Sequence, residues 1–398
     1  MSDSEPGGRE PHGRESGGRE PHGRDPGRIL IVSDAWMPQI NGVVRTLATV
    51  ADRLRATGHV VEVIGPDRFR TIPCPTYPEI RLALAPSRRL AALIEAFAPD
   101  ALHVATEGPL GLAAARIARR RGWRFTTSYH TRFPDYLAAR TALPRPLAYA
   151  WLRRFHGRAA ATLVATESLA AELEARRFRN VRLWSRGVDA ALFHPARAGA
   201  LPFPRPIFLS VGRLAVEKNL PAFLDLDLPG TKLVVGDGPA APALRRAYPD
   251  AQFLGALQGE ALAEVFAAAD VFVFSSRTDT FGLVLLEALA SGLPVAAFPV
   301  PGPRDVLGEA AGRVGILDAD LRRAALSAAG LDRAECRRFA ERFSWEECAA
   351  AFCNSLVPLG SGAWRDCCGP DLVTERPADA AWSDENGAEP DSAPCPAP

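Results

Sequence analysis

The residues best suited to chemistry lie in the stretch from Ser275 to Pro294 of this 398-residue chain. Glu287 is the only charged residue within an apolar segment from Phe281 to Ala290. Because desolvating a lone carboxylate is costly, Glu287 must have a partner. Asp279 stands just before that segment, where the free amides of a helix start would gather and favour anions. The residue types alone also allow a plain helix cap at Asp279 or Thr280 and an arginine partner for Glu287.

Two cations follow a second apolar run. Ile207–Val211 predicts a buried strand, and Arg213 and Lys218 come after it in a loop that enters a helix. Arginine offers a planar fork and lysine a point charge, so the two residues together suit a diphosphate. Of the 47 basic residues only Lys218 and Lys232 are lysines, which draws attention to Lys218.

A histidine and an asparagine–glycine pair are the candidates in the first half of the chain. His130 comes just past a strand that starts at Phe125, at the end where parallel sheets bind ligands. A histidine hydrogen-bonded within the core is the alternative. Asn41 and Gly42 are predicted to open a helix that runs to about Ala56, and such a strand–loop–helix geometry binds phosphate.

Buried strands alternate with helical segments along the chain, which predicts an α/β fold with parallel sheets. The helix within the stretch described first is expected to end at Gly292 and Pro294. The predicted strands are Arg28–Ser33, Val60–Ile64, Ala101–Ala105, Thr162–Ala165, Ile207–Val211 and Val271–Phe274.

In this order the motifs resemble those of the family 4 retaining glycosyltransferases. Asp279 and Glu287, with Phe-Gly between them and Glu-Ala-Leu-Ala-x-Gly-x-Pro at the close, are similar to that family's signature. The wider family usually has Glu where Asp279 stands. Gly-Arg, four residues and Lys-Asn at 212–219 match the family residue for residue. The resemblance runs from about Arg28 to about Leu356.

The resemblance implies a nucleotide-sugar donor and gives each candidate residue a role. Glu287 would bind the ribose hydroxyls and Asp279 the transferred sugar. Arg213 and Lys218 would offset the diphosphate charge, so neither a metal nor a cofactor is expected. The implied catalytic residues are His130, Asp279, Arg213 and Lys218. The implied substrate-binding residues are Asn41, Gly42, Glu287, Phe281, Gly282, Leu283, Gly236 and Gly255.

The implied architecture is the B-type glycosyltransferase fold, an α/β fold of two doubly wound, Rossmann-like domains that face across a cleft. We expect residues 28–198 to form an acceptor-side domain. Residues 199–359 are expected to bind the sugar nucleotide, with the last helix packing back on the first domain. Residues 1–27 and the acidic residues 360–398 contain few branched apolar side chains and are expected to be disordered tails.

The cysteines, the apolar runs and the motifs of the sequence indicate the cellular compartment and limit the kinds of partner. The seven cysteines lack the spacing of a zinc site, and we expect free thiols in a reducing cytoplasm. No apolar run reaches the roughly 18 residues of a membrane span, and no signal peptide is recognised. No nucleic-acid-binding motif is found, so no nucleic-acid partner is expected.

The first half of the chain is basic. Residues 28–198 carry 26 arginines and 13 acidic residues, a net charge of +13 that favours an anionic partner. Within them, Arg140–Arg158 interleaves arginines with Tyr149, Trp151 and Phe155, as in a helix that lies on an anionic membrane. An ordinary packed helix with solvated arginines is the alternative.

The expected activity is transfer of a hexose, with mannose favoured, from a nucleotide sugar such as GDP-mannose or a UDP-hexose. The acceptor would be a hydroxyl of a lipid or a saccharide, and the anomeric configuration would be retained. We expect the enzyme in the cytoplasm, in contact with the inner face of the cell membrane. A glycolipid synthase that uses UDP-glucose, UDP-glucuronate or UDP-sulfoquinovose and a non-catalytic sugar-nucleotide-binding protein are the alternatives.

Overall fold

The computed structural model describes residues 27–39, 41–74, 77–130 and 144–359. The tails predicted to be disordered lie outside these ranges, apart from Gly27. The start of the basic stretch, residues 140–143, also lies outside them.

Contacts divide the chain into two units. The first unit contains the described residues up to Val164, then Leu169–Arg182 and the segment that begins at Leu356. The second unit contains Ala165–Ser168 and Leu183–Ser355. Within the described ranges the chain therefore enters the second unit twice and returns to the first at Leu356.

Trp184 shows why residues 183–198, predicted in the first domain, belong to the second unit. Its indole nitrogen donates a hydrogen bond of 3.0 Å to the carbonyl of Cys348. Its ring centroid lies 5.0 Å from that of Phe352 in helix α14 (Trp345–Ser355). These contacts join residues more than 160 positions apart, a separation that local sequence patterns do not report.

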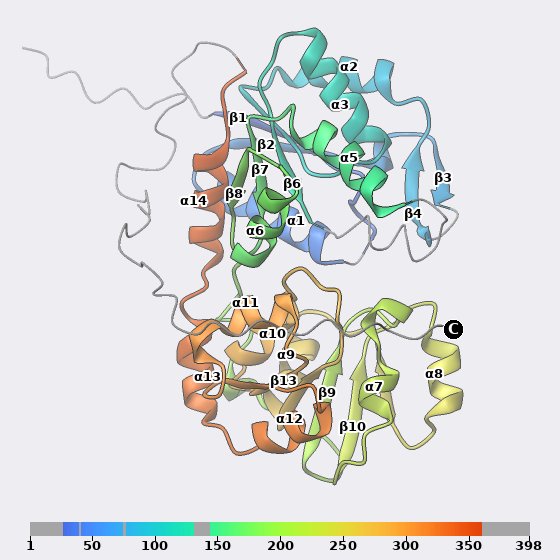
Figure 1. Ribbon diagram of the computed structural model, residues 1–398, viewed down its shortest axis with the longest axis vertical. Coiled ribbons are helices and arrows are strands. Elements are labelled where there is room, and N and C mark those ends of the chain that lie inside the picture. The colour runs from blue at the N-terminus through green and yellow to red at the C-terminus, as the bar shows by residue number, and fades with distance from the viewer. Residues whose placement is uncertain (1–26, 40, 75–76, 131–143, 360–398) are drawn as a thin grey trace, which may run out of the picture. The chain divides into compact units, whose positions relative to one another are not determined.

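The first unit is built on a six-stranded sheet in the order β2-β1-β5-β6-β7-β8 (Figure 1). The strands are β1 (Arg28–Val32), β2 (Val60–Ile64), β5 (Ala101–Val104), β6 (Thr126–Tyr129), β7 (Ala161–Val164) and β8 (Val181–Leu183). The helices are α1 (Gly42–Ala56), α2 (Ser87–Phe97), α3 (Pro109–Arg120), α5 (Arg145–His156) and α6 (Glu167–Ala175).

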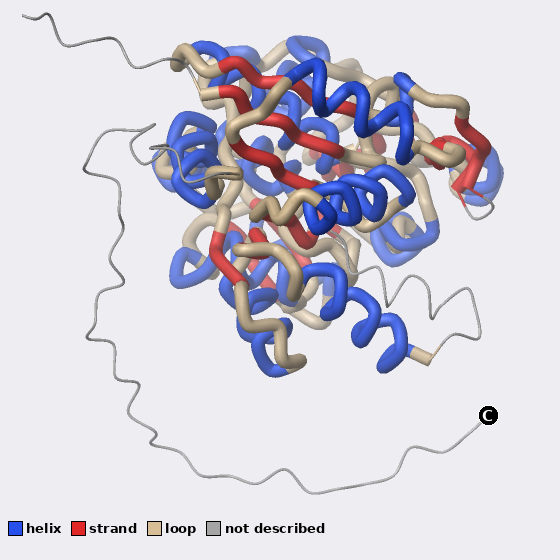
Figure 2. Tube along the Cα trace, turned by 90° about the horizontal axis from the view of Figure 1, so that it is seen from above, coloured by secondary structure: helices blue, strands red, loops and turns tan. Residues whose placement is uncertain are grey.

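Strand β1 lies inside this sheet and pairs in parallel with β2 and β5, so that Ile31 lies opposite Val63 on one side and His103 on the other. An antiparallel hairpin, β3 (Thr71–Cys74) and β4 (Tyr77–Ala83), interrupts the alternation between β2 and β5. Figure 2 shows the strands of this sheet side by side with helices next to them.

The second unit is built on another six-stranded parallel sheet, in the order β11-β10-β9-β12-β13-β14. This is the strand order of a dinucleotide-binding Rossmann fold. The strands are β9 (Ile207–Val211), β10 (Thr231–Val235), β11 (Gln252–Gly255), β12 (Val271–Phe274), β13 (Val295–Ala297) and β14 (Gly315–Leu317). The helices besides α14 are α7 (Pro221–Leu224), α8 (Ala241–Ala247), α9 (Gly259–Ala268), α10 (Leu283–Ala290), α11 (Pro301–Leu307), α12 (Leu321–Ala328) and α13 (Arg333–Ala340).

Helices cover both faces of the second sheet. Alternate residues of β12 divide between two hydrophobic clusters: Phe272 and Phe274 pack toward α9 and α10, whereas Val271 and Val273 pack toward α7 and α12. Because both faces are covered, β12 is apolar at every position and β9 at all but Ser210, and this is why continuous apolar runs located these two strands. The predicted α/β class with two doubly wound parallel sheets is confirmed.

The predicted bounds of β2, β9 and β12 are confirmed, those of β1 and β5 differ by one residue at the end of the strand, and those of β7 differ by one residue at both ends. The helix predicted from Phe281 starts instead at Leu283. Gly282 precedes it with a φ of 88°, in the left-handed region that glycine adopts readily, so the helix cannot begin earlier.

Candidate functional site

Each sheet reverses its strand order at one point, and α/β sheets bind ligands outside the carboxyl ends of the strands at such points. In the second sheet the reversal lies between the neighbouring strands β9 and β12. The loop after β9 carries Arg213 and Lys218, and the loop after β12 carries Asp279. The fold therefore brings these three candidate residues to one place.

Hydrogen bonds hold the two loops together. The Ser275 hydroxyl donates to the carbonyl oxygen of Lys218 over 2.9 Å. The side-chain amide of Asn219 donates back to the carbonyl oxygen of Ser275 over 3.2 Å. Asn219 adopts a left-handed conformation, with a φ of 51°, that asparagine tolerates better than most residues. The Ser275 hydroxyl thus fixes the backbone at Lys218, and the Ser275 carbonyl fixes the side chain of Asn219.

Lys218 and Asp279 form an ion pair. The ammonium nitrogen lies 2.6 Å from one carboxylate oxygen and 2.8 Å from the other. The Lys218 side chain is 29% exposed and that of Asp279 18%, so a ligand can still reach both. The sequence predicted separate roles for the two residues, at the diphosphate and at the sugar. Their direct contact gives the site a cation and an anion that a charged substrate can separate.

Arg213 adds a second cation to the same loop. Its guanidinium lies 4.0 Å from the carboxylate of Glu217, and the two side chains are 25% and 13% exposed. The backbone carbonyl of Glu217 in turn accepts a hydrogen bond of 3.4 Å from the hydroxyl of Ser276. The loop after β12 therefore supports the segment that holds both cations.

Helix α10 begins four residues after Asp279, and its N-cap residue is Gly282, which has no side chain to cap the first turn. Neither Asp279 nor Thr280 occupies the N-cap position. A helix start carries a partial positive charge and free amides, and both attract an anion. Leu283 is the first residue of this helix.

Two of the predicted substrate-binding residues are buried. Phe281 is 6% exposed and packs in the core cluster, and Glu287 is 3% exposed within α10. Helix α11 packs closely against the loop that precedes Phe281, because a Cβ added to Gly302 would lie 2.7 Å from the carbonyl oxygen of Asp279. The loop is therefore fixed by the core packing of Phe281 and by the close contact with α11.

Gly236 and Gly255 also lie close together, at the carboxyl ends of β10 and β11 in the second sheet. The amide of Gly236 donates to the carbonyl of Gly255 over 2.7 Å. Gly236 has a φ of 141°, and a Cβ there would lie 1.9 Å from the carbonyl oxygen of Gly212. Glycine at position 236 thus permits the close approach of the chain after β10 to the chain after β9.

The remaining predicted residues, Asn41, Gly42 and His130, belong to the first unit. The Asn41 side chain accepts hydrogen bonds of 3.0 Å from the amides of Val43 and Val44, so it caps α1. Gly42 is the first residue of that helix, and the predicted helix from Gly42 to about Ala56 is confirmed. His130 follows the end of β6, as predicted, and the next residues lie outside the described ranges.

Asp34 was missed as a structural centre of the first unit. It follows β1, at the point where the first sheet reverses its strand order, and it accepts hydrogen bonds from the amides of Leu110 (2.8 Å) and Gly111 (3.1 Å) in α3. The hydroxyl of Thr106 donates to it over 2.9 Å. Burial raises the pKa of Asp34, and these hydrogen bonds oppose the rise. An acidic residue directly after a buried strand was the available signal.

A second buried pair lies at the carboxyl end of β5. The ring of His156 is fully buried, and its Nε2 lies 3.0 Å from a carboxylate oxygen of Glu107. Its other ring nitrogen lies 2.9 Å from the hydroxyl of Thr127. Glu107 remains 19% exposed, so the histidine orients a carboxylate that solvent and ligands can reach.

Within the described ranges, no three or more His, Cys, Asp and Glu residues are grouped so that they could hold a metal ion. Among the helices in those ranges, none combines the length and the apolar character that crossing a membrane requires.

Two family models match the chain. Residues 40–192 match the model described as Glycosyltransferase Family 4, and residues 205–330 match the model described as Glycosyl transferases group 1. The first match contains Asn41, Gly42 and His130, and the second contains the loops after β9 and β12.

Curated proteins similar to this chain include mannosyltransferases. A GDP-mannose-dependent alpha-mannosyltransferase of Mycobacterium tuberculosis is 36% identical over 70% of this chain and 81% of its own length. Its namesake in Mycolicibacterium smegmatis is 36% identical over 76% of this chain and 87% of its own length. Sulfoquinovosyl transferase SQD2 of Arabidopsis thaliana is 34% identical over 60% of this chain and 50% of its own length.

Solved structures with the same fold are known. Sucrose-phosphate synthase of Thermosynechococcus elongatus superimposes with a TM-score of 0.68 at 21% identity, over 82% of this chain and 97% of that one. HepE of Anabaena, solved in complex with UDP and glucose, gives a TM-score of 0.60 at 13% identity, over 82% of this chain and 98% of that one.

Proposed function

Since this chain belongs to the family 4 glycosyltransferases, we propose that it transfers mannose from GDP-mannose to a hydroxyl of a lipid or a saccharide. Retention of the anomeric configuration is part of the proposal. The similar curated proteins include five GDP-mannose-dependent mannosyltransferases, which favours this donor. Others are a sulfoquinovosyl transferase and an alpha-monoglucosyldiacylglycerol synthase, which favours a lipid acceptor.

The observation that carries the proposal is the Lys218–Asp279 ion pair in the loops that precede α10, whose N-cap residue is Gly282. In the proposed complex the diphosphate lies at the helix start and draws the Lys218 ammonium away from Asp279. The freed carboxylate then accepts a hydrogen bond from a hydroxyl of the transferred sugar. As the bond to the sugar breaks, negative charge grows on the leaving diphosphate. Lys218 and Arg213 are already in position to stabilise that charge without a metal or a cofactor.

The other candidate residues complete the proposed donor site. Glu287 binds the ribose hydroxyls, and the amides of Phe281, Gly282 and Leu283 contact sugar and phosphate. His130 donates or accepts a hydrogen bond at the sugar. The remaining proposed contacts come from the backbone near Asn41, Gly42, Gly236 and Gly255.

A panel of nucleotide sugars tests the donor. We expect GDP-mannose to bind in calorimetry and to be hydrolysed slowly without an acceptor, and Asp279→Asn to weaken hydrolysis more than binding. Faster turnover of UDP-glucose, UDP-glucuronate or UDP-sulfoquinovose would replace mannose in the proposal. Saturable binding with no turnover on any lipid or saccharide acceptor would instead indicate a sugar-nucleotide-binding protein.

Contact with an anionic membrane at the inner face of the cell is the second part of the proposal. One face of α5 exposes Leu147 (59%) and Trp151 (40%), Arg154 continues the same stripe at helical spacing, and Arg158 follows just after the end of the helix. Partial burial, and then the positive charges of Arg154 and two arginines of α3, hold the pKa of Arg158 below its ordinary value. Apolar side chains beside clustered arginines favour an anionic bilayer surface.

Vesicle binding tests this part. Each basic residue near an anionic bilayer contributes about 1 kcal/mol. We therefore expect Arg154→Glu with Arg158→Glu to weaken binding to phosphatidylglycerol vesicles at low salt and to leave GDP-mannose affinity unchanged. The neighbouring Arg153 donates to the carbonyl of Arg176 and is left unchanged in this variant. If the unchanged protein does not bind such vesicles, a soluble saccharide replaces the lipid as the proposed acceptor.

A further inference from the structure

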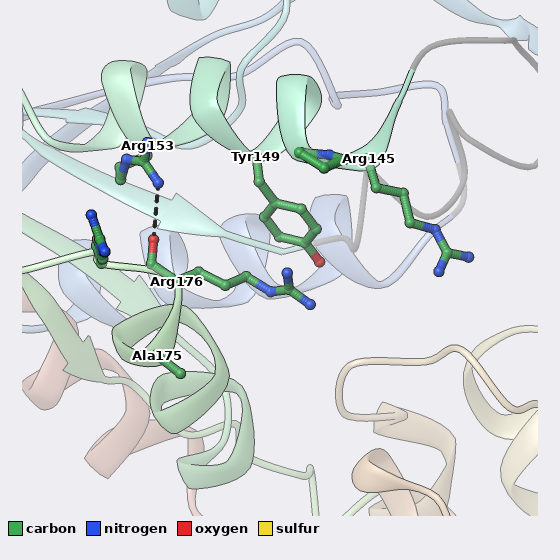
Figure 3. Close-up of a pocket in the computed structure, with 7 residues that line it drawn as sticks. Arg145, Tyr149, Arg153, Ala175 and Arg176 are labelled. Atoms are coloured by element: carbon green, nitrogen blue, oxygen red, sulfur yellow. Dashed lines mark hydrogen bonds between the residues drawn. The ribbon is translucent and has the colours of Figure 1, made fainter. Parts of the chain in front are cut away.

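We propose that the first unit carries a second binding site, an arginine pocket that binds the phosphate group of a phosphate mono- or diester. The pocket has a volume of about 290 Å³ and lies where α5 meets the end of α6 (Figure 3). Four of its seven lining residues are arginines and none is acidic; they are Arg145, Pro146, Tyr149, Arg153, Ala175, Arg176 and Arg177. The proposed glycosyl transfer does not require this pocket, so the two proposals can fail separately.

Tyr149 and Glu172 fix one of the arginines. The Tyr149 side chain is buried at 4% exposure, and its hydroxyl donates to the Glu172 carboxylate over 3.2 Å. The Arg176 guanidinium lies 3.9 Å from the centroid of the Tyr149 ring and donates to the same carboxylate over 3.3 Å. Stacking and the shared carboxylate thus hold the guanidinium in place, which lowers the entropy that ligand binding would otherwise cost.

Arg153 reaches the pocket from the other helix. Its guanidinium donates a hydrogen bond of 3.2 Å to the main-chain carbonyl of Arg176, and Figure 3 shows this bond across the gap between α5 and the end of α6. A guanidinium has five N–H groups, and this bond orients the side chain through one of them. Two arginines from different helices are therefore set at fixed positions around one space.

Arg177 stands at a position where helices usually place glycine. The amide of Phe178 donates to the carbonyl of Leu173 (3.0 Å) and the amide of Arg177 to that of Glu174 (2.8 Å), the two bonds of a Schellman ending. The residue after the helix must then be left-handed, and Arg177 has a φ of 67°. An arginine there adopts a backbone conformation that glycine would adopt without strain. Unlike glycine, the arginine at this position places a guanidinium in the lining of the pocket.

The chemistry of the lining selects the ligand. Glu172 is the acidic group beside the pocket, and it is bonded to Tyr149 and Arg176, so the net charge around the space is strongly positive. Guanidinium forks bind tetrahedral oxyanions through paired hydrogen bonds. The volume lies at the low end of small-molecule sites, which suits a phosphate ester better than a complete nucleotide sugar. The ester can come from a phospholipid headgroup or from a soluble metabolite.

Calorimetry on the whole protein at low salt tests the site, with glycerol 3-phosphate as the monoester and glycerophosphoglycerol as the diester. We expect at least one probe to bind, and Arg177→Gly to weaken that binding about tenfold, because one charge-assisted contact is lost. The melting temperature should stay equal or rise, since glycine suits the left-handed position. GDP-mannose binding should not change. Arg179→Ala, an exposed arginine outside the pocket, is the matched control and should bind the probes normally.

Vesicles that contain phosphatidylglycerol, compared with phosphatidylcholine vesicles, distinguish the sources. Loss of phosphatidylglycerol binding in Arg177→Gly but not in Arg179→Ala supports the site with a lipid headgroup as its ligand. If Arg177→Gly loses binding to the soluble probes but not to the vesicles, the site is supported and its ligand is a soluble ester. Equal losses in both variants would indicate unspecific attraction to a basic surface and overturn the proposal. Absence of binding to both soluble probes and to the vesicles would overturn it as well.

Discussion

In the first unit, the loop after β1 delivers the carboxylate of Asp34 to the start of α3, where two amides and a hydroxyl bind it. In the second unit, the corresponding loop after β9 delivers the ammonium of Lys218 to Asp279, in the loop that leads to α10 and its N-cap residue Gly282. Both places are the points at which the strand order of a parallel sheet reverses. The same topology thus presents one helix start that a carboxylate fills and one, preceded by glycine, at which we propose that the diphosphate binds.

The difference explains why two similar sheets can have different roles. A helix start satisfied by a buried carboxylate has no free amides for a phosphate, and the added negative charge repels one. A helix start with an ammonium nearby can accept a diphosphate and stabilise its growing charge. The comparison predicts that changes at Lys218 alter turnover, whereas changes at Asp34 alter stability.

Lys218→Ala should have the largest effect. It removes the cation that stabilises the leaving diphosphate, so kcat should fall by about 100-fold or more while GDP-mannose affinity changes less. Steady-state kinetics and calorimetry measure the two quantities. Lys232→Ala is the control, because Lys232 is the other lysine and its ammonium bonds only to the carbonyl of Leu224 among the contacts seen in this structure. Equal kcat values for the two variants would remove Lys218 from the mechanism.

Asp34→Ala should come second, and its effect should be on folding. Two amides of α3 would lose their acceptor, and the free energy of unfolding should fall by about 2 kcal/mol. Urea unfolding measures the loss. Asp52→Ala is the matched control, since Asp52 is 72% exposed and pairs only on the surface with Arg55. If Asp34→Ala kept a normal unfolding free energy but no longer bound the donor, the comparison would be contradicted.

Asp34 should also give the stability a pH dependence of known sign. Its pKa is raised in the folded protein above the ordinary 3.8, so the folded state binds the proton more tightly than the unfolded state does. Its contribution to the unfolding free energy should therefore fall as the pH rises from about 3.8 through the raised pKa. Urea unfolding of Asp34→Asn and of the unchanged protein across that range should show the difference. A pH-independent difference would mean that the pKa is not raised.

Asn41→Ala should have a smaller effect. It removes the cap from α1 and should lower the unfolding free energy by about 1 kcal/mol. Because Asn41 uses its oxygen on the helix's own amides, we expect little change in KM for the donor. A large rise in KM with unchanged stability would instead place this helix start at the donor phosphates.

Chelation should have the smallest effect of all. If Lys218 and Arg213 take the place of a divalent ion at the diphosphate, activity should persist in excess EDTA. Activity lost in EDTA and restored by added Mg²⁺ or Mn²⁺ would show that the two cations are not sufficient.

Local patterns predicted the parts of this protein that depend on neighbours in the sequence. Strands β9 and β12 of the second sheet are largely buried, so their apolar runs located them, and the Asn-Gly pair located the start of α1. The Lys218–Asp279 pair and the contact of Asp34 with α3 join residues far apart in the chain, and no spacing rule reports them. The arginine pocket depends on the left-handed backbone at Arg177, which composition does not reveal.

The return of the chain to the first unit at Leu356 affects the order in which the protein can fold during synthesis. The amide of Leu359 donates to the carbonyl of Asp100 over 2.8 Å, and its side chain packs against the core of the first unit. The unit made first therefore lacks one of its pieces until nearly all the described residues have left the ribosome. The second unit, continuous from Leu183 to Ser355, is complete before that point. A fragment that ends at Arg182 should for this reason be less stable than the same unit within the whole chain.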